Sequence, residues 1–218
     1  MKIVLGYLLT YIYVFLILIL LGIFKKKKII NINTSRKLIH IFMGFTWIIM
    51  IYFFGISIHL IILPITMVLF NFLSYKWNIA SSMEQENKES KGTIYYAVSF
   101  VIMALITYFY PDFLPFYGIG VFVLALGDGL APFIGRKWPK HKIGSSNKTY
   151  AGSLTVCLCT IFVITIFKLY YNLDLNFLKI ILLGIVAIPL ELFNKKGSDN
   201  ITLPLGISLL SFILERWM

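Results

Sequence analysis

Residues 127–153 read GDGLAPFIGRKWPKHKIGSSNKTYAGS, and they mark the point where a long apolar run gives way to a basic loop. Residues 121–126, before this stretch, are all apolar, and the apolar run resumes after Asp128 at residues 130–134. An apolar run that ends in lysines and arginines is typical of a helix that reaches a membrane surface. Asp128 is therefore a functional candidate, because ionisable groups within such runs are costly.

Glycines and basic residues accompany this acid. Glycines let the backbone approach a ligand closely, and an acid, glycines and a basic cluster are the groups that hold a metal ion and a polyphosphate. The simpler alternative is an ordinary basic loop, which would explain the lysines but not Asp128. The first three glycines of the stretch are Gly127, Gly129 and Gly135, and its Lys and Arg residues are Arg136, Lys137, Lys140, Lys142 and Lys148.

Composition places the chain among integral membrane proteins. Of its 218 residues, 59% are hydrophobic and only 13% are charged, and the mean hydropathy is +0.87. No soluble domain of this size needs so much apolar surface. The formal net charge of +11 is explained by the enrichment of lysine and arginine on one side of a membrane, so we expect no nucleic-acid partner.

Apolar segments predict an all-α, polytopic membrane protein with about eight transmembrane helices (seven or eight) in a single domain, 1–218. Gly55 alone separates the second and third segments, which predicts a tight hairpin. The last segment is short and contains Pro204, so it is a candidate for a broken or half-crossing helix. The segments are 3–24, 38–54, 56–73, 94–110, 114–134, 154–171, 177–193 and 201–217.

The charge bias of the loops predicts their orientation. Loops 25–37, 74–93, 135–153 and 194–200 carry 16 of the 20 Lys and Arg residues, whereas the opposite connections carry none. The basic loops are therefore expected in the cytoplasm, with both termini outside and the catalytic groups at the cytoplasmic face of a bacterial membrane. Residues 1–34 are interpreted as a retained anchor helix with its basic loop, preceding a core at 35–204.

Three polar residues open the second segment. Arg36, Lys37 and His40 lie three and four residues apart, which places them on one helix face. Two cations and an imidazole on one face suit a phosphate site. The alternatives are that Arg36 and Lys37 anchor the helix at the membrane surface and that His40 packs between helices.

Two further groups precede helices. Lys91, Gly92 and Thr93 lie before the fourth segment, and helix capping is the alternative role of Thr93. Lys148, Thr149, Gly152 and Ser153 lie before the sixth segment, where a helix N-terminus with Gly and Ser or Thr binds anions. No GxxxxGK[ST] loop occurs in the sequence.

Acids and an amide gather at the same expected face. Glu191 lies near the end of the seventh segment, and Asp199 with Asn200 begins the eighth. Together with Asp128, these carboxyl and amide oxygens are ligands of the kind that Mg²⁺ takes, beside the oxygens of a substrate phosphate. Asp199 alone is equally explained as a helix cap.

The motifs RKLIH, KGT, GDGLAPFIGRKWPKHKI, KTYAGS, PLE and DN followed by proline occur in this order. The chain thereby resembles the polyprenol kinase family, which includes dolichol kinase, phytol kinase and a CTP-dependent diacylglycerol kinase. The resemblance runs from about residue 35 to 204. It implies that residues 127–153 bind a nucleotide, usually CTP, and that Arg36, Lys37, Asp128 and Gly135 are essential, with Lys148, Gly152 and Asp199 at the same site.

One position departs from the family's pattern. The family often has K-[ST]-x-E-G-S, and Ala151 stands here in place of the glutamate. If that acid holds metal, then Asp128, Glu191 or Asp199 must compensate, or the activity is altered.

The expected function is a membrane kinase that transfers the γ-phosphoryl group of CTP, or of another nucleoside triphosphate, to a lipid alcohol. The acceptor is a polyprenol, a phytol-like alcohol or diacylglycerol. Mg²⁺ and membrane lipids are the other expected partners. His40 or an acid would accept the proton of the alcohol. A cytidylyltransferase that forms a CDP-lipid is the near alternative, and an ion-coupled transporter is the alternative of another class.

Overall fold

The computed structural model describes residues 1–77, 91–139, 141–143, 148–192 and 197–217. Within these ranges the regular structure is helical, apart from an isolated antiparallel bridge between Lys142 and Thr149. Lys140 and parts of three of the basic loops lie outside the described residues. The elements are α1 (Lys2–Lys26), α2 (Ile32–Gly44), α3 (Thr46–Phe54), α4 (His59–Trp77), α5 (Gly92–Phe109), η1 (Pro111–Phe113), α6 (Leu114–Phe122), η2 (Val123–Asp128), α7 (Gly129–Lys137), α8 (Tyr150–Tyr171), α9 (Phe177–Leu192) and α10 (Asp199–Trp217).

The elements of the described part of the chain form eight helical passes, as the apolar segments predict. The helices α2 and α3 make one pass, and η1, α6, η2 and α7 make another. Six passes are long and apolar enough to cross a membrane. The other two are α9, with 16 residues, and α10, which carries charged residues at both ends. The all-α, polytopic fold is thus confirmed.

Two local expectations are corrected. The second helix begins at Ile32 rather than near residue 38, because the side chain of Asn31 accepts a hydrogen bond from the backbone N–H of Thr34 and caps the helix. In addition, α10 continues through Pro204 and is not broken there. A proline in the second turn removes a single backbone hydrogen bond, and the rest of the helix is unaffected.

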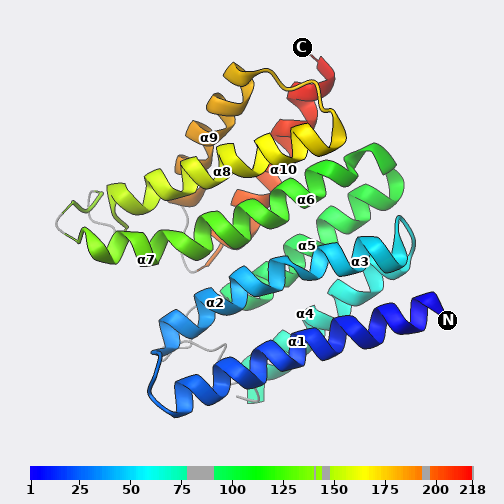
Figure 1. Cartoon of the computed structure of the whole chain (residues 1–218), viewed down its shortest axis with the longest axis vertical. Helices are drawn as coiled ribbons and strands as arrows, with labels where there is room; N and C mark the ends of the chain where they lie inside the picture. The colour runs from blue at the N-terminus through cyan, green and yellow to red at the C-terminus, as the bar shows by residue number, and fades with distance from the viewer. Residues whose placement is uncertain (78–90, 140, 144–147, 193–196, 218) are drawn as a thin grey trace.

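The passes form two halves (Figure 1), and the most buried pass belongs to the second half. Figure 1 shows α1 and the α2–α3 pass in front of α4 and α5, and the helices α6 to α10 in the other half. The pass Pro111–Lys137 is 72% buried, against 28–44% for the other five candidate spans. Its middle is a π-helix, η2, which ends at Asp128. The acid of the apolar run therefore lies on the most enclosed helix of the bundle.

Two glycines bring α2 against this central pass. A Cβ added at Gly44 would lie 2.5 Å from the Cβ of Ala125 in η2. A Cβ added at Gly129, the first residue of α7, would lie 2.5 Å from Cγ1 of Ile41 in α2. Small residues at such positions allow two membrane helices to approach closely. The close contact places the side chains of α2 directly beside Asp128.

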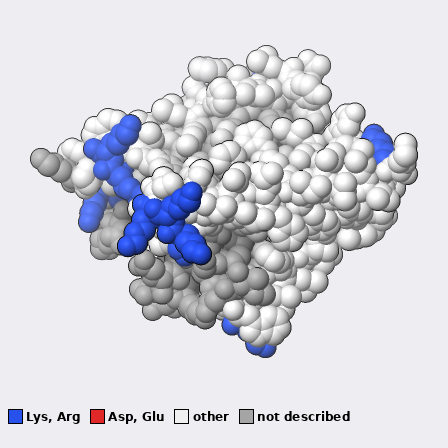
Figure 2. Space-filling view, turned by 60° about the horizontal axis from the view of Figure 1, so that its bottom comes forward, with Lys and Arg blue, Asp and Glu red and all other residues white. Residues whose placement is uncertain are grey.

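Charge is distributed unevenly on the outside of the bundle. On the face shown in Figure 2, most of the visible Lys and Arg side chains gather at one end, with smaller basic patches at the right and lower edges, and no Asp or Glu is visible. Many large apolar side chains are exposed on the helices, for example Ile19 of α1 and Leu169 of α8. An exposed apolar surface of this extent fits contact with lipid rather than with water.

Candidate functional site

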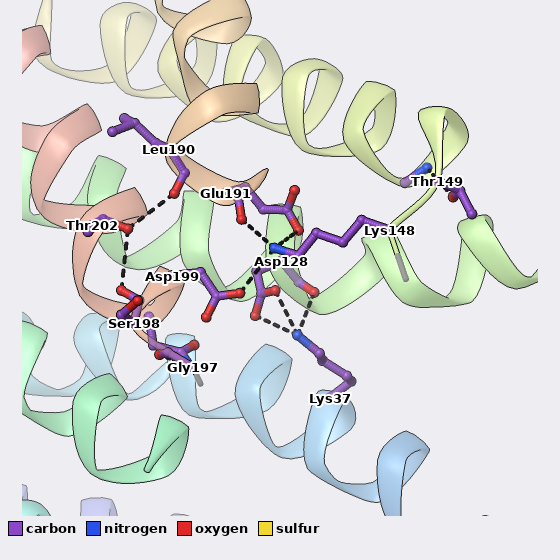
Figure 3. A network of polar contacts seen from close by, with 12 residues as sticks. Lys37, Asp128, Lys148, Thr149, Leu190, Glu191, Gly197, Ser198, Asp199 and Thr202 are labelled. Carbon is purple, nitrogen blue, oxygen red and sulfur yellow. Dashed lines mark hydrogen bonds and ion pairs between the residues drawn. The ribbon is translucent and has the colours of Figure 1, made fainter. Parts of the chain in front are cut away.

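Asp128 is held by a lysine from another helix. The Asp128 side chain is 3% exposed. Lys37 of α2 donates from Nζ to both carboxylate oxygens at 2.7 Å and to the main-chain oxygen of Asp128 at 3.1 Å (Figure 3). A buried carboxylate needs such a partner, because removing the charge from water is expensive. The pair joins α2 to the end of η2.

His40 lies on the other side of the same carboxylate. It follows Lys37 by three residues and is 3% exposed, and its Nδ1 is 3.7 Å from Oδ2 of Asp128. Neither ring nitrogen has a hydrogen-bond partner among the described residues. The Tyr96 ring packs against the imidazole with centroids 4.7 Å apart, and the Tyr96 hydroxyl donates to the main-chain oxygen of His40 at 2.9 Å. Tyr96 thus fixes the position of His40 and leaves its nitrogens available.

A second lysine joins α9 to α10. Lys148 Nζ lies 2.6 Å from Oε1 of Glu191 and 3.3 Å from Oδ2 of Asp199, and it also donates to the main-chain oxygen of Glu191 (Figure 3). Burial alone would lower the pKa of Lys148, but the carboxylates of Glu191 and Asp199 outweigh burial and raise it. Lys148 therefore remains an ammonium ion at neutral pH.

The backbone around this pair is tied down locally. The hydroxyl of Thr202 in α10 donates to the main-chain oxygen of Leu190 at 3.1 Å (Figure 3). The side-chain amide of Asn200 donates to the main-chain oxygen of Gly197 at 3.1 Å. These bonds fix the start of α10 against the end of α9, so Glu191 and Asp199 face one another across a short gap.

The three acids converge on one point. One carboxylate oxygen each from Asp128, Glu191 and Asp199 lies within 4.8 Å of the others. Oε2 of Glu191 (5% exposed) and Oδ1 of Asn200 (4% exposed) are buried without a hydrogen-bond partner among the described residues. Oxygens that are close together and unsatisfied are suitable ligands for a hard divalent cation. The three carboxylates predicted from the sequence therefore fit Mg²⁺ in type and spacing.

These groups line a common pocket of about 490 Å³, called the polar pocket below. Its sides come from α2, α7, the segment before α8, and the facing ends of α9 and α10. Arg136 donates from Nη1 to the Thr34 hydroxyl at 3.2 Å, which ties the end of α7 to α2. The lining residues are Asn33, Arg36, Lys37, Asp128, Ala131, Pro132, Gly135, Arg136, Pro139, Lys142, Lys148, Thr149, Gly152, Ser153, Glu191 and Asp199.

The start of α8 forms one wall of the polar pocket. Thr149 caps α8 by accepting a hydrogen bond from the backbone N–H of Gly152 at 3.1 Å. A Cβ added at Gly135 would lie 2.6 Å from Oγ1 of Thr149, so the end of α7 and the start of α8 approach closely. Ser153, whose hydroxyl is buried without a partner among the described residues, follows in the first turn. The N-terminus of α8 therefore faces the polar pocket, and a helix N-terminus favours the binding of an anion.

Most of the residues selected from the sequence meet in the polar pocket, but six do not line it. His40 contacts Asp128 from behind it. Gly127 faces α8, where an added Cβ would be 3.6 Å from Val156. Asn200 is buried beside Asp199. The remaining three, Lys91, Gly92 and Thr93, lie at the start of α5 and do not line the polar pocket.

Neither Thr93 nor Asp199 has the helix-capping role that the sequence offers as an alternative. Thr93 is the second residue of α5 and does not cap it, because Lys91 precedes the helix. Asp199 is the first residue of α10, and its carboxylate is directed at Lys148 rather than at the helix N–H groups. Ala151 does not line the polar pocket, and the three carboxylates come from other helices.

Sequence reasoning missed Tyr96 and Asn33. Tyr96 lies within an apolar run, where a tyrosine is expected for packing alone, and nothing in the sequence connects it with His40. Asn33 lies in the basic loop before the motif RKLIH, and its role depends on the helix starting earlier than expected. If Asn31 is recognised as the helix cap, α2 starts at Ile32 and Asn33 falls on the same helix as Arg36.

Comparison with known proteins finds relatives of this chain. The chain is 37% identical to a phytol kinase of the cyanobacterium Synechocystis sp. over 146 residues, which cover 64% of this chain. It is 26% identical to phytol kinase 1, chloroplastic, of Arabidopsis thaliana over 212 residues, which cover 86% of this chain. The chain is a homologue of the phytol kinases. This confirms the resemblance to the polyprenol kinase family.

The matched region spans 61% of the length of the cyanobacterial relative and 68% of the plant relative. No family model matches the sequence. No solved structure matches it either.

Proposed function

We propose that this chain is a membrane lipid-alcohol kinase, which transfers the terminal phosphoryl group of a nucleoside triphosphate to a phytol-like alcohol. The observation that carries the proposal is the meeting of three carboxylates with Arg36, Lys37 and Lys148 in one pocket at one end of an apolar bundle. Two relatives are named phytol kinases. Phosphoryl transfer relies mainly on positioning and charge neutralisation, and these residues supply both.

The cationic side chains of the polar pocket bind the phosphates. Arg36 offers a planar fork for two phosphate oxygens, whereas Lys142 and Lys148 act as point charges. The first turn of α8 contributes backbone N–H groups. Gly135 and Gly152 allow α7 and the start of α8 to pack closely at this wall of the polar pocket. CTP is the donor that the resemblance implies.

Asp128, Glu191, Asp199 and the Oδ1 atom of Asn200 would hold Mg²⁺. When bound there, Mg²⁺ supplies positive charge that neutralises the phosphate oxygens. Lys37 and Lys148 now pair with the same carboxylates. Both lysines line the polar pocket, so their ammonium groups would also lie beside phosphates bound there.

His40 accepts the proton of the alcohol. The carboxylate of Asp128 is engaged by Lys37 in this structure and would hold Mg²⁺ in the loaded site, whereas both nitrogens of His40 lack a partner among the described residues. A neutral imidazole has one acceptor nitrogen. The alcohol oxygen forms a bond to the γ-phosphorus, the bond from that phosphorus to the bridging oxygen breaks, and the nucleoside diphosphate leaves. The hydroxyl proton moves to His40, and Asp128 stabilises the resulting imidazolium ion.

The site faces the cytoplasm in this proposal. The polar pocket lies at the end of the bundle that carries most of the basic residues, and such residues are enriched on the cytoplasmic side of membranes. The nucleotide then enters from the cytoplasm, and the acceptor comes from the surrounding lipid.

The test is a direct assay. Purified full-length protein in lipid nanodiscs is incubated with Mg²⁺ and γ-labelled CTP, ATP or GTP, against phytol, geranylgeraniol, undecaprenol and diacylglycerol. We expect a labelled lipid monophosphate and release of the nucleoside diphosphate. Release of pyrophosphate with transfer of the cytidylyl group would show a cytidylyltransferase instead. No labelled lipid with any donor, under conditions where the protein remains folded, would refute the kinase.

A further inference from the structure

A second cavity lies behind the site, in the N-terminal half of the bundle. It has a volume of about 60 Å³ and is enclosed by α1, the α2–α3 pass, α4 and α5; we call it the apolar cavity. Most of its lining is apolar, and Met43, Met50, Met67, Ala97 and Phe100 are among the lining residues. Its size is well above that of a single water site, and its chemistry favours hydrocarbon.

The apolar cavity also has a few polar groups. His40, Asn71, Thr93 and Tyr96 line it. Asn71 is engaged, because its amide donates to the main-chain oxygen of Thr93 at 2.9 Å, and the Tyr96 hydroxyl is engaged by the main chain of His40. The imidazole of His40 is buried with both nitrogens lacking a partner among the described residues. A buried acceptor of this kind is costly unless something donates to it.

His40 also connects this cavity to the polar pocket. Its Nδ1 lies 3.7 Å from Oδ2 of Asp128, and Asp128 lines the polar pocket. The imidazole therefore lines the apolar cavity and contacts the polar pocket only through the carboxylate of Asp128. A molecule with a hydrocarbon body and one hydroxyl fits this arrangement, because the body fills the cavity and the hydroxyl donates to His40 beside Asp128.

The side chains that line the apolar cavity can repack around a bound molecule. Met43, Met50 and Met67 are unbranched, and methionine fills irregular space and repacks readily. Pro64 lies in the second turn of α4 and lines the cavity, and a proline there removes one backbone hydrogen bond. A long-chain alcohol is larger than the cavity, so the cavity receives the hydroxyl end, and the rest of the chain leaves between helices.

We propose that the apolar cavity binds the hydroxyl end of the lipid alcohol, with the hydroxyl on His40 and the adjoining carbons against Met50, Met67 and Phe100. This inference rests on the proposed kinase function and adds to it the subsite of the acceptor. Tyr96 is a positioning residue, since it holds the imidazole through the main chain and through its ring.

A competing place for the alcohol exists on the surface. An aromatic groove of about 510 Å³ is lined by residues of α3, α6, η2 and α8, among them Trp47, Phe122, Phe162, Ile166 and Tyr170. It is larger than the apolar cavity, but its lining includes no histidine or carboxylate that could accept the proton of an alcohol. The chemistry therefore favours the cavity, and an experiment can separate the two.

The first experiment measures binding without catalysis. Full-length protein in nanodiscs receives a phytol analogue that carries a diazirine near the hydroxyl and an alkyne at the tail, without nucleotide. After irradiation, we expect adducts on α3, α4 and α5 at Met50, Met67 or Phe100, suppressed by excess phytol. Adducts confined to Phe162 and Ile166, or adducts that excess phytol does not suppress, would overturn the proposal.

The second experiment fills the two spaces separately. Ala97→Leu adds bulk to the apolar cavity, and Ile166→Phe adds bulk to the aromatic groove. We expect Ala97→Leu to raise the KM for phytol by about tenfold or more, as a steric change in an apolar pocket does, with the KM for the nucleotide unchanged. Ile166→Phe should leave both values unchanged. The reverse pattern would place the alcohol in the groove.

A third variant covers the case in which Ala97→Leu does not fold. Met50→Ala enlarges the apolar cavity, and we expect it to shift the preference toward alcohols that are branched next to the hydroxyl. An unchanged preference would contradict the proposal. The proposed kinase activity and the proposed subsite can be refuted separately. If the protein is inactive but labelling at Met50 or Met67 is still suppressed by excess phytol, only the kinase activity is refuted.

Discussion

Lys37 Nζ lies 2.7 Å from both carboxylate oxygens of Asp128, across the contact between α2 and η2. The two residues are 91 positions apart in the sequence. Their meeting depends on Gly44 and Gly129, which bring α2 against the central pass. The pair is therefore a sensitive indicator of whether α2 is correctly docked.

Replacing Asp128 with asparagine keeps the shape of the side chain and removes its charge. We expect turnover to fall by about 10²–10³-fold or more, as it does when one charge-stabilising group of a site is lost. The measurement is kcat with γ-labelled nucleotide at saturating Mg²⁺. Binding of Mn²⁺, followed by electron paramagnetic resonance in the absence of nucleotide, should weaken in parallel. Near-normal turnover and Mn²⁺ binding would remove Asp128 from the site.

Replacing Arg36 with lysine tests whether Arg36 binds phosphate or only anchors α2. A lysine preserves the charge but cannot form the paired hydrogen bonds of a guanidinium. We expect the KM for the nucleotide to rise by roughly tenfold, which corresponds to one charge-assisted hydrogen bond.

The matched control for Arg36 is the double change Lys26→Gln with Lys27→Gln at the end of α1. Those residues carry charge at the same end of the bundle but do not line the polar pocket. The control should cost little. Full activity of Arg36→Lys, and also of a variant in which Arg36 and Lys37 are both neutralised, would show that these residues only anchor the helix.

Replacing Gly44 with alanine tests the docking of α2. The new Cβ would lie 2.5 Å from the Cβ of Ala125, and neither atom can move without its backbone. We expect a loss of about 1–3 kcal/mol in stability, typical of overpacking, together with lower activity. Thermal unfolding and kcat report the two effects.

Gly127→Ala is the control within the motif GDG. Its added Cβ would meet Val156 at 3.6 Å, an ordinary contact. We expect this variant to fold and to remain active, because Gly127 does not line the polar pocket. A strong loss of nucleotide binding in Gly127→Ala would mean that this glycine belongs to the site, as the sequence suggests.

The orientation in the membrane can be measured with single cysteines. In a background without Cys157 and Cys159, Lys137→Cys lies at the basic end of the bundle, and Asp174→Cys lies in the connection from α8 to α9; both positions are exposed. In intact bacterial cells, a thiol reagent that cannot cross the membrane should label position 174 and spare position 137. Labelling in the opposite sense would place the polar pocket outside the cytoplasm.

Local composition and motif order predict the class of fold and most of the residues that line the polar pocket. Each apolar segment is long enough to bury its own backbone hydrogen bonds as a helix, so local composition predicts the passes without knowledge of their packing. Asp128 is recognisable because an ionisable group within an apolar run is energetically costly. Glu191 and Asp199 stand out because acids are rare in this chain. The residues with the right chemistry were therefore recognisable one by one.

Only the tertiary structure decided how these residues pair. Whether Lys37 or Lys148 reaches a given carboxylate depends on contacts between helices that are far apart in sequence, such as Gly44 with Ala125. The same packing excludes Gly127 and the Lys91–Thr93 segment from the polar pocket, although their residue types suit a phosphate site. It also places Tyr96 on His40 and opens the apolar cavity beside it. Side chains interact at distances of a few ångströms, and sequence spacing fixes such distances only within one helix.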